Sequence, residues 1–207
     1  MFKDRNEAAK LLAQKLEPYR DRNPLILAIP RGAVPMARII ADSLGCQLDV
    51  VLVRKLRAPQ QSELAIGSVD ESGWVYLTDF AQDYGGDSDY IEAEKQRQLE
   101  VIRQRRAHYT PIRAPIDPAG RVVIVIDDGL ATGATMISAL HALRAKKPAL
   151  LVCAVPVAAP DTLARIAPMA DAVVCLHAPR LFQAVGQFYQ HFPQVEDSEV
   201  IALLKQA

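Results

Sequence analysis

The sequence has no excess of charge of either sign and no long apolar run. Lysine plus arginine and aspartate plus glutamate both number 24, so the net charge does not favour nucleic acid or an anionic membrane as the main partner. No apolar run approaches the roughly 18 residues of a membrane helix, and the opening stretch MFKDRNEAAK lacks the apolar core of a signal peptide. We therefore expect a cytoplasmic protein that binds neither nucleic acid nor a membrane.

Cysteine is also scarce. The three cysteines, Cys46, Cys153 and Cys175, are odd in number, widely separated and set among apolar neighbours. This pattern predicts buried thiols rather than a metal site or disulfides. Half of the 207 residues are hydrophobic, so the chain can bury a substantial core, and we expect residues 1–207 to form a single domain.

Short apolar or β-branched runs alternate with segments whose apolar residues recur at helical spacing. The runs predict strands at 25–29, 48–53, 122–126, 150–155 and 172–176. The helical spacing predicts helices at 6–16, 35–44, 90–108, 133–146, 161–167 and 198–205, the third ending in arginines that we expect to be solvated. Residues 64–69 and 74–77 flank a turn and predict a β-hairpin. Repeated β-α-β units predict an α/β fold, a mainly parallel twisted sheet with helices on both faces.

The run VVIVIDDGLATGATM, residues 122–136, carries the most chemical information. Its first five residues predict a strand buried on both faces, which places Asp127 and Asp128 at the sheet edge where open α/β folds bind ligands. Two adjacent carboxylates repel each other unless a diol or a cation engages them. Small residues then lead into a helix, whose first N–H groups favour a phosphate together with the hydroxyls of Thr132 and Thr135. The run predicts a phosphorylated sugar with a divalent metal nearby; the plainer alternative is an ordinary strand, turn and helix in a Rossmann-like protein.

This run resembles the phosphoribosyl-diphosphate (PRPP) binding motif of type I phosphoribosyltransferases. The resemblance implies that Asp127 and Asp128 bind the ribose hydroxyls and act in catalysis, and that the loop after them holds the 5'-phosphate. The residues implied in ribose and 5'-phosphate binding are Asp127, Asp128, Gly129, Ala131, Thr132, Gly133, Ala134 and Thr135. Gly129 departs from the motif, because most of that superfamily has an aliphatic residue there.

Two further loops fit the same site. Arg31 and Gly32 follow the first predicted strand, in a segment that resembles the diphosphate loop of the superfamily; the alternative is that Arg31 caps the sheet edge. Arg54 and Lys55 follow the second strand, ahead of a polar loop at 56–63 that resembles the mobile loop of adenine phosphoribosyltransferases. All four residues are therefore assigned to diphosphate binding, with an ordinary charged loop as the alternative for the last two. The mobile loop and the hairpin are expected at about 54–77.

The resemblance extends over nearly the whole chain. The segments FKDRNEAAKLL, PRGAVPMA, VRKLRAP, ELAIGSV, DDGLATGAT and FQAVGQFY recur together in a group of bacterial predicted phosphoribosyltransferases whose acceptor is unassigned. That group commonly has glycine where this chain has Ala33, so the backbone of the diphosphate loop is expected to be less open here.

The acceptor side is less clearly marked. Ala131 stands where hypoxanthine and guanine enzymes have an aspartate that exchanges a proton with the base, whereas adenine enzymes use a glutamate from the mobile-loop hairpin. Glu63 lies in the comparable region and is our candidate acid/base, although a surface glutamate is the commoner case. Phe182, in a C-terminal hood segment at about 177–207, resembles the aromatic residue that stacks on the base, although an aromatic there is core at least as often.

The resemblance implies a magnesium-dependent transferase of nucleotide metabolism that moves 5-phosphoribosyl from PRPP to a nitrogen of a small acceptor, such as a nucleobase, and releases diphosphate. Mg²⁺ would bridge diphosphate and ribose oxygens largely through ligand and water, so no protein residue is assigned directly to the metal. The alternative is a non-catalytic sensor of PRPP or a nucleotide with the same fold, and a third reading is a phosphosugar enzyme of other chemistry. The superfamily often dimerises, so the resemblance also allows a homodimer.

Overall fold

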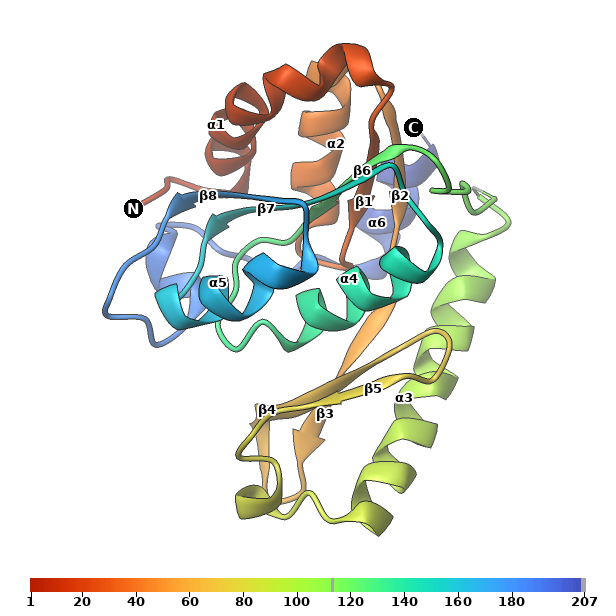
Figure 1. The fold of residues 1–207 in the computed structure, drawn as a ribbon, viewed down its shortest axis with the longest axis vertical. Helices are drawn as coiled ribbons and strands as arrows, with labels where there is room; N and C mark the ends of the chain where they lie inside the picture. Colours follow the sequence, from red (N-terminus) through yellow and green to blue (C-terminus); the bar gives the residue numbers. More distant parts are fainter. Residues whose placement is uncertain (113, 206–207) are drawn as a thin grey trace.

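A computed structural model describes residues 1–112 and 114–205. It shows a five-stranded parallel sheet with helices on both faces, and a smaller antiparallel sheet that extends from it beside one long helix (Figure 1). The α/β fold predicted from the sequence is confirmed. Residues 113, 206 and 207 lie outside the described residues, and with them the last two residues of the predicted domain and of its hood segment.

The large sheet has the strand order β2-β1-β6-β7-β8, and all neighbouring strands run parallel. Its strands are β1 (Leu25–Ala28), β2 (Gln47–Val50), β6 (Val122–Ile126), β7 (Leu150–Val157) and β8 (Ala172–His177). The central strands β1 and β6 are buried along their whole length, as their continuous apolar runs predict. Ala28 pairs with Ile126 at the last register position, so the loops after β1 and β6 leave the sheet side by side.

Helices cover the two faces of the large sheet, and each face has its own apolar core (Figure 1). The helices are α1 (Arg5–Leu16), α2 (Val34–Leu44), α3 (Ser88–Tyr109), α4 (Ala134–Ala145), α5 (Pro160–Ile166) and α6 (Asp197–Lys205), with short 3₁₀ helices η1 (Glu17–Arg22), η2 (Gln82–Tyr84), η3 (Ala167–Met169) and η4 (Val185–Phe188). α1, α2 and α6 contribute to the core beneath Ile124 and Ile126, whereas α4 and α5 contribute to the core beneath Val123 and Val125. Successive strand residues point to opposite faces, so the apolar run of β6 supplies both cores.

The smaller sheet contains β3 (Val53–Ala58), β4 (Gln61–Asp70) and β5 (Val75–Leu77) in the antiparallel order β3-β4-β5. The 22-residue helix α3 runs beside it (Figure 1). The predicted hairpin is confirmed as β4 and β5. Its turn is held by Asp70, whose Oδ1 accepts hydrogen bonds from the N–H groups of Ser72 and Trp74 at 2.8 and 3.1 Å.

The predicted polar loop at 56–63 is wrong. β3 continues to Ala58, and β4 follows after a turn of two residues. The charges in VRKLRA suggested a loop, but Leu56 and Ala58 are buried and Arg57 between them is exposed, which is the alternation of a half-buried strand. Residues 48–53, predicted as one strand, divide between β2 and β3.

The start of the chain lies against its C-terminal segment. Phe2 forms a parallel bridge with Tyr189, and its N–H donates to the Phe188 carbonyl at 2.7 Å. The Tyr189 hydroxyl in turn donates to the Asp128 carbonyl at 2.7 Å. Both terminal segments therefore reach the loop that follows β6. Through residues 1–112 and 114–205, no helix has the length and apolar character needed to cross a membrane.

Candidate active site

A cavity of about 300 Å³ lies at the carboxyl edge of β1 and β6. The loop after β1, the loop between β6 and α4, the strand β3 and the C-terminal segment all contribute to its wall. It brings together most of the residues assigned to the sugar site from the sequence. Those that line it are Arg31, Gly32, Lys55, Asp127, Asp128, Gly129, Ala131, Thr132, Gly133 and Thr135.

The two carboxylates at the end of β6 have different partners. Asp127 Oδ1 accepts a hydrogen bond from the Asp128 N–H at 2.9 Å, and its Oδ2 lies 3.5 Å from Thr135 Oγ1. Burial, followed by the charge of Asp128, raises the pKa of Asp127 well above its ordinary range. Burial also raises the pKa of Asp128, but the charge of Arg5 opposes this rise. A ligand that donates hydrogen bonds or brings a cation would relieve the repulsion between the carboxylates.

Arg5 was given no role from the sequence. Its Nε and Nη2 donate to Asp128 Oδ2 at 3.1 and 2.8 Å, and its Nη1 donates to the Pro193 carbonyl at 2.6 Å. A signal was nevertheless present, because Arg5 lies on the same face of α1 as Ala8 and Ala9, which are fully buried. A charged residue on the apolar face of a helix requires a partner within the fold.

The loop from β6 into α4 has unused backbone donors. Within the described residues, the N–H groups of Ala131, Thr132 and Gly133 have no hydrogen-bond acceptor. Gly133 has a φ of 75°, and a Cβ at this position would come within 2.6 Å of Thr162 Cγ2. Thr162 Oγ1 also donates to the Ala131 carbonyl at 2.5 Å, which holds the loop against α5. Free N–H groups at a helix N-terminus form an anion site.

Gly129, the departure from the family motif, has a steric explanation. A Cβ at this position would lie 2.5 Å from Val185 Cγ1 and 3.0 Å from Val157 Cγ1. Val185 belongs to η4 in the C-terminal segment, and it lines the cavity itself. The space that an aliphatic side chain at position 129 would need is therefore taken by Val185.

The loop after β1 approaches the acid pair closely. A Cβ at Gly32 would lie 2.1 Å from Asp128 Oδ2, so only glycine allows this approach. The Pro30–Arg31 peptide bond in the same loop is cis. The Arg31 guanidinium borders the cavity and lies 3.4 Å from a carboxylate oxygen of Glu196 on the C-terminal side.

Neighbouring cations on β3 point in different directions. Lys55 lines the cavity, whereas Arg54 is not among the described residues that do so. Successive strand residues alternate in direction, and Arg54 faces α3, where its Nε donates to Gln98 Oε1 at 2.9 Å. The assignment of Arg54 to diphosphate stays a prediction.

Neither Glu63 nor Phe182 is among the described residues that line the cavity. Glu63 is exposed on β4. The Phe182 ring lies 4.9 Å from that of Phe188, measured between centroids. The C-terminal side chains at the cavity are instead Val185 and Phe192. The roles of Glu63 and Phe182 toward an acceptor stay predictions.

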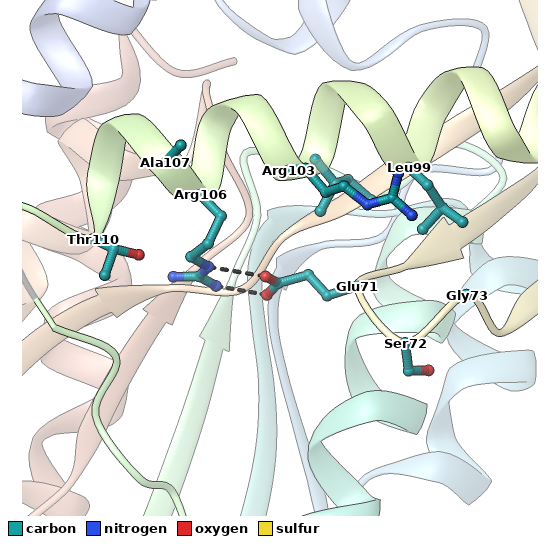
Figure 2. Close-up of a pocket in the computed structure, with 9 residues that line it drawn as sticks. Glu71, Ser72, Gly73, Leu99, Arg103, Arg106, Ala107 and Thr110 are labelled. Carbon is teal, nitrogen blue, oxygen red and sulfur yellow. Dashed lines mark hydrogen bonds and ion pairs between the residues drawn. The ribbon is translucent and has the colours of Figure 1, made fainter.

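A second cavity of about 520 Å³ lies between α3 and the β4–β5 turn (Figure 2). Arg106 donates there from Nε and Nη2 to the two carboxylate oxygens of Glu71, at 2.8 and 2.5 Å.

The arginines at the end of α3 were expected to be solvated, and this expectation is wrong for two of the three. The side chain of Arg103 is 67% exposed, but those of Arg105 and Arg106 are 15% and 22% exposed.

Known proteins share both the sequence and the fold of this chain. The family model of the phosphoribosyl transferase domain matches residues 3–188. A protein of Mycobacterium tuberculosis with the provisional name phosphoribosyl transferase is 41% identical over 208 residues, which cover 100% of this chain and 47% of that protein. The chain thus spans about half the length of the curated relatives it matches.

Two solved structures share the fold of this chain. The crystal structure of TT1426 from Thermus thermophilus is 42% identical, with a TM-score of 0.81 over 99% of this chain and 98% of that one. A hypothetical protein of Neisseria gonorrhoeae with bound ppGpp is 12% identical, with a TM-score of 0.50 over 100% of this chain and 98% of that one. At this low identity the second likeness shows the fold alone.

Proposed function

The chain belongs to the family of phosphoribosyl transferase domains, and we propose that it transfers 5-phosphoribosyl from PRPP to a nitrogen of a small acceptor, a nucleobase, with release of diphosphate. One observation carries the proposal. Two carboxylates, a loop with free backbone N–H groups and two cations surround a single cavity. PRPP presents ribose hydroxyls, a 5'-phosphate and a diphosphate, and each of these groups has its chemical complement there.

Each part of the cavity has a distinct task in this reaction. Asp127 and Asp128 accept hydrogen bonds from the ribose hydroxyls, because a carboxylate is a strong acceptor and bound donors favour its ionised form over the protonated one that burial favours in Asp127. The loop 131–135 and the N-terminus of α4 hold the 5'-phosphate. Arg31 and Lys55 neutralise the diphosphate while its bond to the anomeric carbon breaks. The acceleration comes from orientation and placed charge rather than from a protein nucleophile.

The residues present fit a magnesium ion that arrives with PRPP. Within the described residues, no group of three or more His, Cys, Asp or Glu side chains could hold a metal on its own. Mg²⁺ commonly keeps several waters and binds substrate phosphates, so the oxygens of PRPP and water would hold it, while Asp127 and Asp128 would fix the ribose beside it. When bound, the ion supplies positive charge to the leaving diphosphate.

The acceptor enters from the side of η4, where Val185 and Phe192 border the cavity. Ala131 carries no ionisable group, so a proton exchanged with the acceptor must go elsewhere. Glu63 is the proposed acid/base. This role requires the β3–β4 hairpin to bring an exposed side chain to the bound sugar.

Release of diphosphate tests the proposal directly. The protein is incubated with PRPP, Mg²⁺ and a panel of nucleobases, and diphosphate is measured against an Asp127→Asn, Asp128→Asn double variant. We expect release that depends on one base and is lost in the double variant. Binding of PRPP without release for any base would contradict the transferase and favour the sensor. Failure to bind PRPP would contradict both functions.

A further inference from the structure

Arg5 does not line the cavity of the sugar site, but it contacts two residues that do, Asp128 and Phe192. We propose that Arg5 is a positioning residue of the sugar site: it occupies one carboxylate oxygen of Asp128 and leaves the other oxygen for a ribose hydroxyl. The inference rests on the proposed function, because it takes a sugar hydroxyl as the partner of Asp128.

The two carboxylate oxygens of Asp128 differ in their hydrogen bonds. Both donors of Arg5 end on Oδ2, and within the described residues no hydrogen bond from another residue reaches Oδ1. Oδ2 also faces the loop after β1, because a Cβ at Gly32 would lie 2.1 Å from it. Asp128 lines the cavity, so Oδ1 is the oxygen that can accept a bond from a ligand.

Arg5 is itself held in place. Its Nη1 donates to the Pro193 carbonyl at 2.6 Å, and its guanidinium lies 3.7 Å from the centroid of the Phe192 ring. The side chain is only 10% exposed. Phe192 stacks on Tyr189 at 4.7 Å between centroids, and the Tyr189 hydroxyl holds the Asp128 carbonyl. One cluster therefore fixes both the side chain and the backbone of Asp128 before a ligand binds, which is the condition for a preorganised site.

The charge of Arg5 acts in the same direction as its geometry. Two adjacent buried carboxylates raise each other's pKa. The positive charge of Arg5 and its hydrogen bonds lower the pKa of Asp128 and so favour the ionised acceptor, with Lys55 contributing in the same sense. Loss of Arg5 would leave the Asp128 carboxylate without the two hydrogen bonds that fix Oδ2, and therefore free to rotate.

A double-mutant cycle separates positioning from general support of the fold. PRPP with Mg²⁺ is titrated calorimetrically into the parent, Arg5→Gln, Asp128→Asn and the protein with both changes. We expect Arg5→Gln to weaken PRPP binding about tenfold in the parent background, and less than about threefold when Asp128 is already Asn, since residues in direct contact are energetically coupled. An equal loss in both backgrounds would show that Arg5 only supports the fold, and would overturn the inference.

Two further variants control the cycle. Arg5→Lys keeps the charge but cannot donate to Asp128 and Pro193 in the same way, so its PRPP affinity should lie between those of the parent and Arg5→Gln. It also replaces Arg5→Gln in the cycle if that variant fails to fold. Arg38→Gln removes an arginine that pairs with Asp42 on α2, away from the cavity, and should leave PRPP affinity unchanged. A parent protein that does not bind PRPP would overturn the proposed function; a parent that binds PRPP, with Arg5→Gln binding equally well, would overturn this inference alone.

Discussion

The carboxyl edge of the large sheet and the small antiparallel sheet differ in how firmly their charged side chains are held at the cavity. At the edge, Asp128 is fixed by Arg5 and by the Tyr189 hydroxyl. On the small sheet, Arg54 turns to α3 and Glu63 is exposed. The donor side of the cavity is therefore built by the fold itself, whereas the acid/base assigned to the acceptor has no fixed place at the cavity.

This difference follows from how each region is made. Parallel strands end at one common edge, so the loops after β1 and β6 must meet, and helix starts supply N–H groups there. A hairpin imposes only alternation on its side chains. Changes at the edge of the large sheet should therefore reduce PRPP binding strongly, and changes on the small sheet should affect it little.

Gly133→Val should have the largest effect. The new side chain would meet Thr162 and enter the loop whose N–H groups are free, so binding of ribose 5-phosphate should be lost. Gly120→Val is the matched control, because Gly120 has a similar φ of 67° but a Cβ there would have nothing within 4 Å. Calorimetric titration of both variants checks this. Normal binding by Gly133→Val would place the phosphate site elsewhere.

Asp128→Asn should have the next largest effect. It removes a charged acceptor for the ribose hydroxyl, and loss of such a hydrogen bond costs about 1 to 3 kcal/mol of PRPP binding free energy. Folding should change little, because the amide keeps the shape of the carboxylate. Calorimetry measures the PRPP affinity of variant and parent, and thermal unfolding measures their stability. Equal PRPP affinity in variant and parent would remove Asp128 from the sugar site.

The buried acid pair should also reduce stability as the pH rises. The pKa of Asp127 is raised from 3.8 to about 8, so the folded state retains a proton that the unfolded state has already released. Raising the pH from about 4 to 8 therefore favours unfolding, and the effect levels off above the raised pKa. Asp127→Asn removes the group that retains this proton, so the melting temperature of the variant relative to the parent should be higher at pH 8 than at pH 5. A difference between variant and parent that is the same at both pH values would contradict the raised pKa.

Glu63→Gln should have the smallest effect on PRPP affinity, within about threefold. PRPP binds at the carboxyl edge of the large sheet, whereas Glu63 lies on the small sheet. If Glu63 is the acid/base, turnover with the identified acceptor should fall by about 100-fold to 10,000-fold. The neighbouring exposed residue Gln61 offers a control through Gln61→Ala, which should change neither quantity. Unchanged turnover in Glu63→Gln across the pH range would show a surface residue without a part in the chemistry.

The sequence predicts the large sheet closely, because its strands are continuous apolar runs and its helices have apolar residues at helical spacing. β6 begins and ends where the apolar run VVIVI predicts. The same run places Asp127 and Asp128 at the sheet edge, and the cavity does gather them with the loop 131–135. Strand, acid pair and small-residue loop are all local features, so one stretch of sequence contains the information.

The sequence predictions are wrong or incomplete where contacts between distant parts of the chain determine the structure. The charges of β3 suggested a loop, but pairing with β4 makes it a strand. Arg5 lies 123 residues from Asp128 in sequence, so only the folded chain reveals their contact. Likewise, Val185 takes the space that a side chain at Gly129 would need, although the two residues are far apart in sequence. The cytoplasmic location and the homodimer stay predictions from the sequence.

A crystal structure with PRPP and Mg²⁺ tests the central claim most directly, namely that the carboxyl edge of β1 and β6 is a preformed site for the donor sugar. We expect the 5'-phosphate to lie against the backbone of 131–135 and a ribose hydroxyl to donate to Asp128 Oδ1, with the bonds from Arg5 to Oδ2 unchanged. A PRPP molecule bound elsewhere, or a ribose held without Asp127 and Asp128, would contradict it.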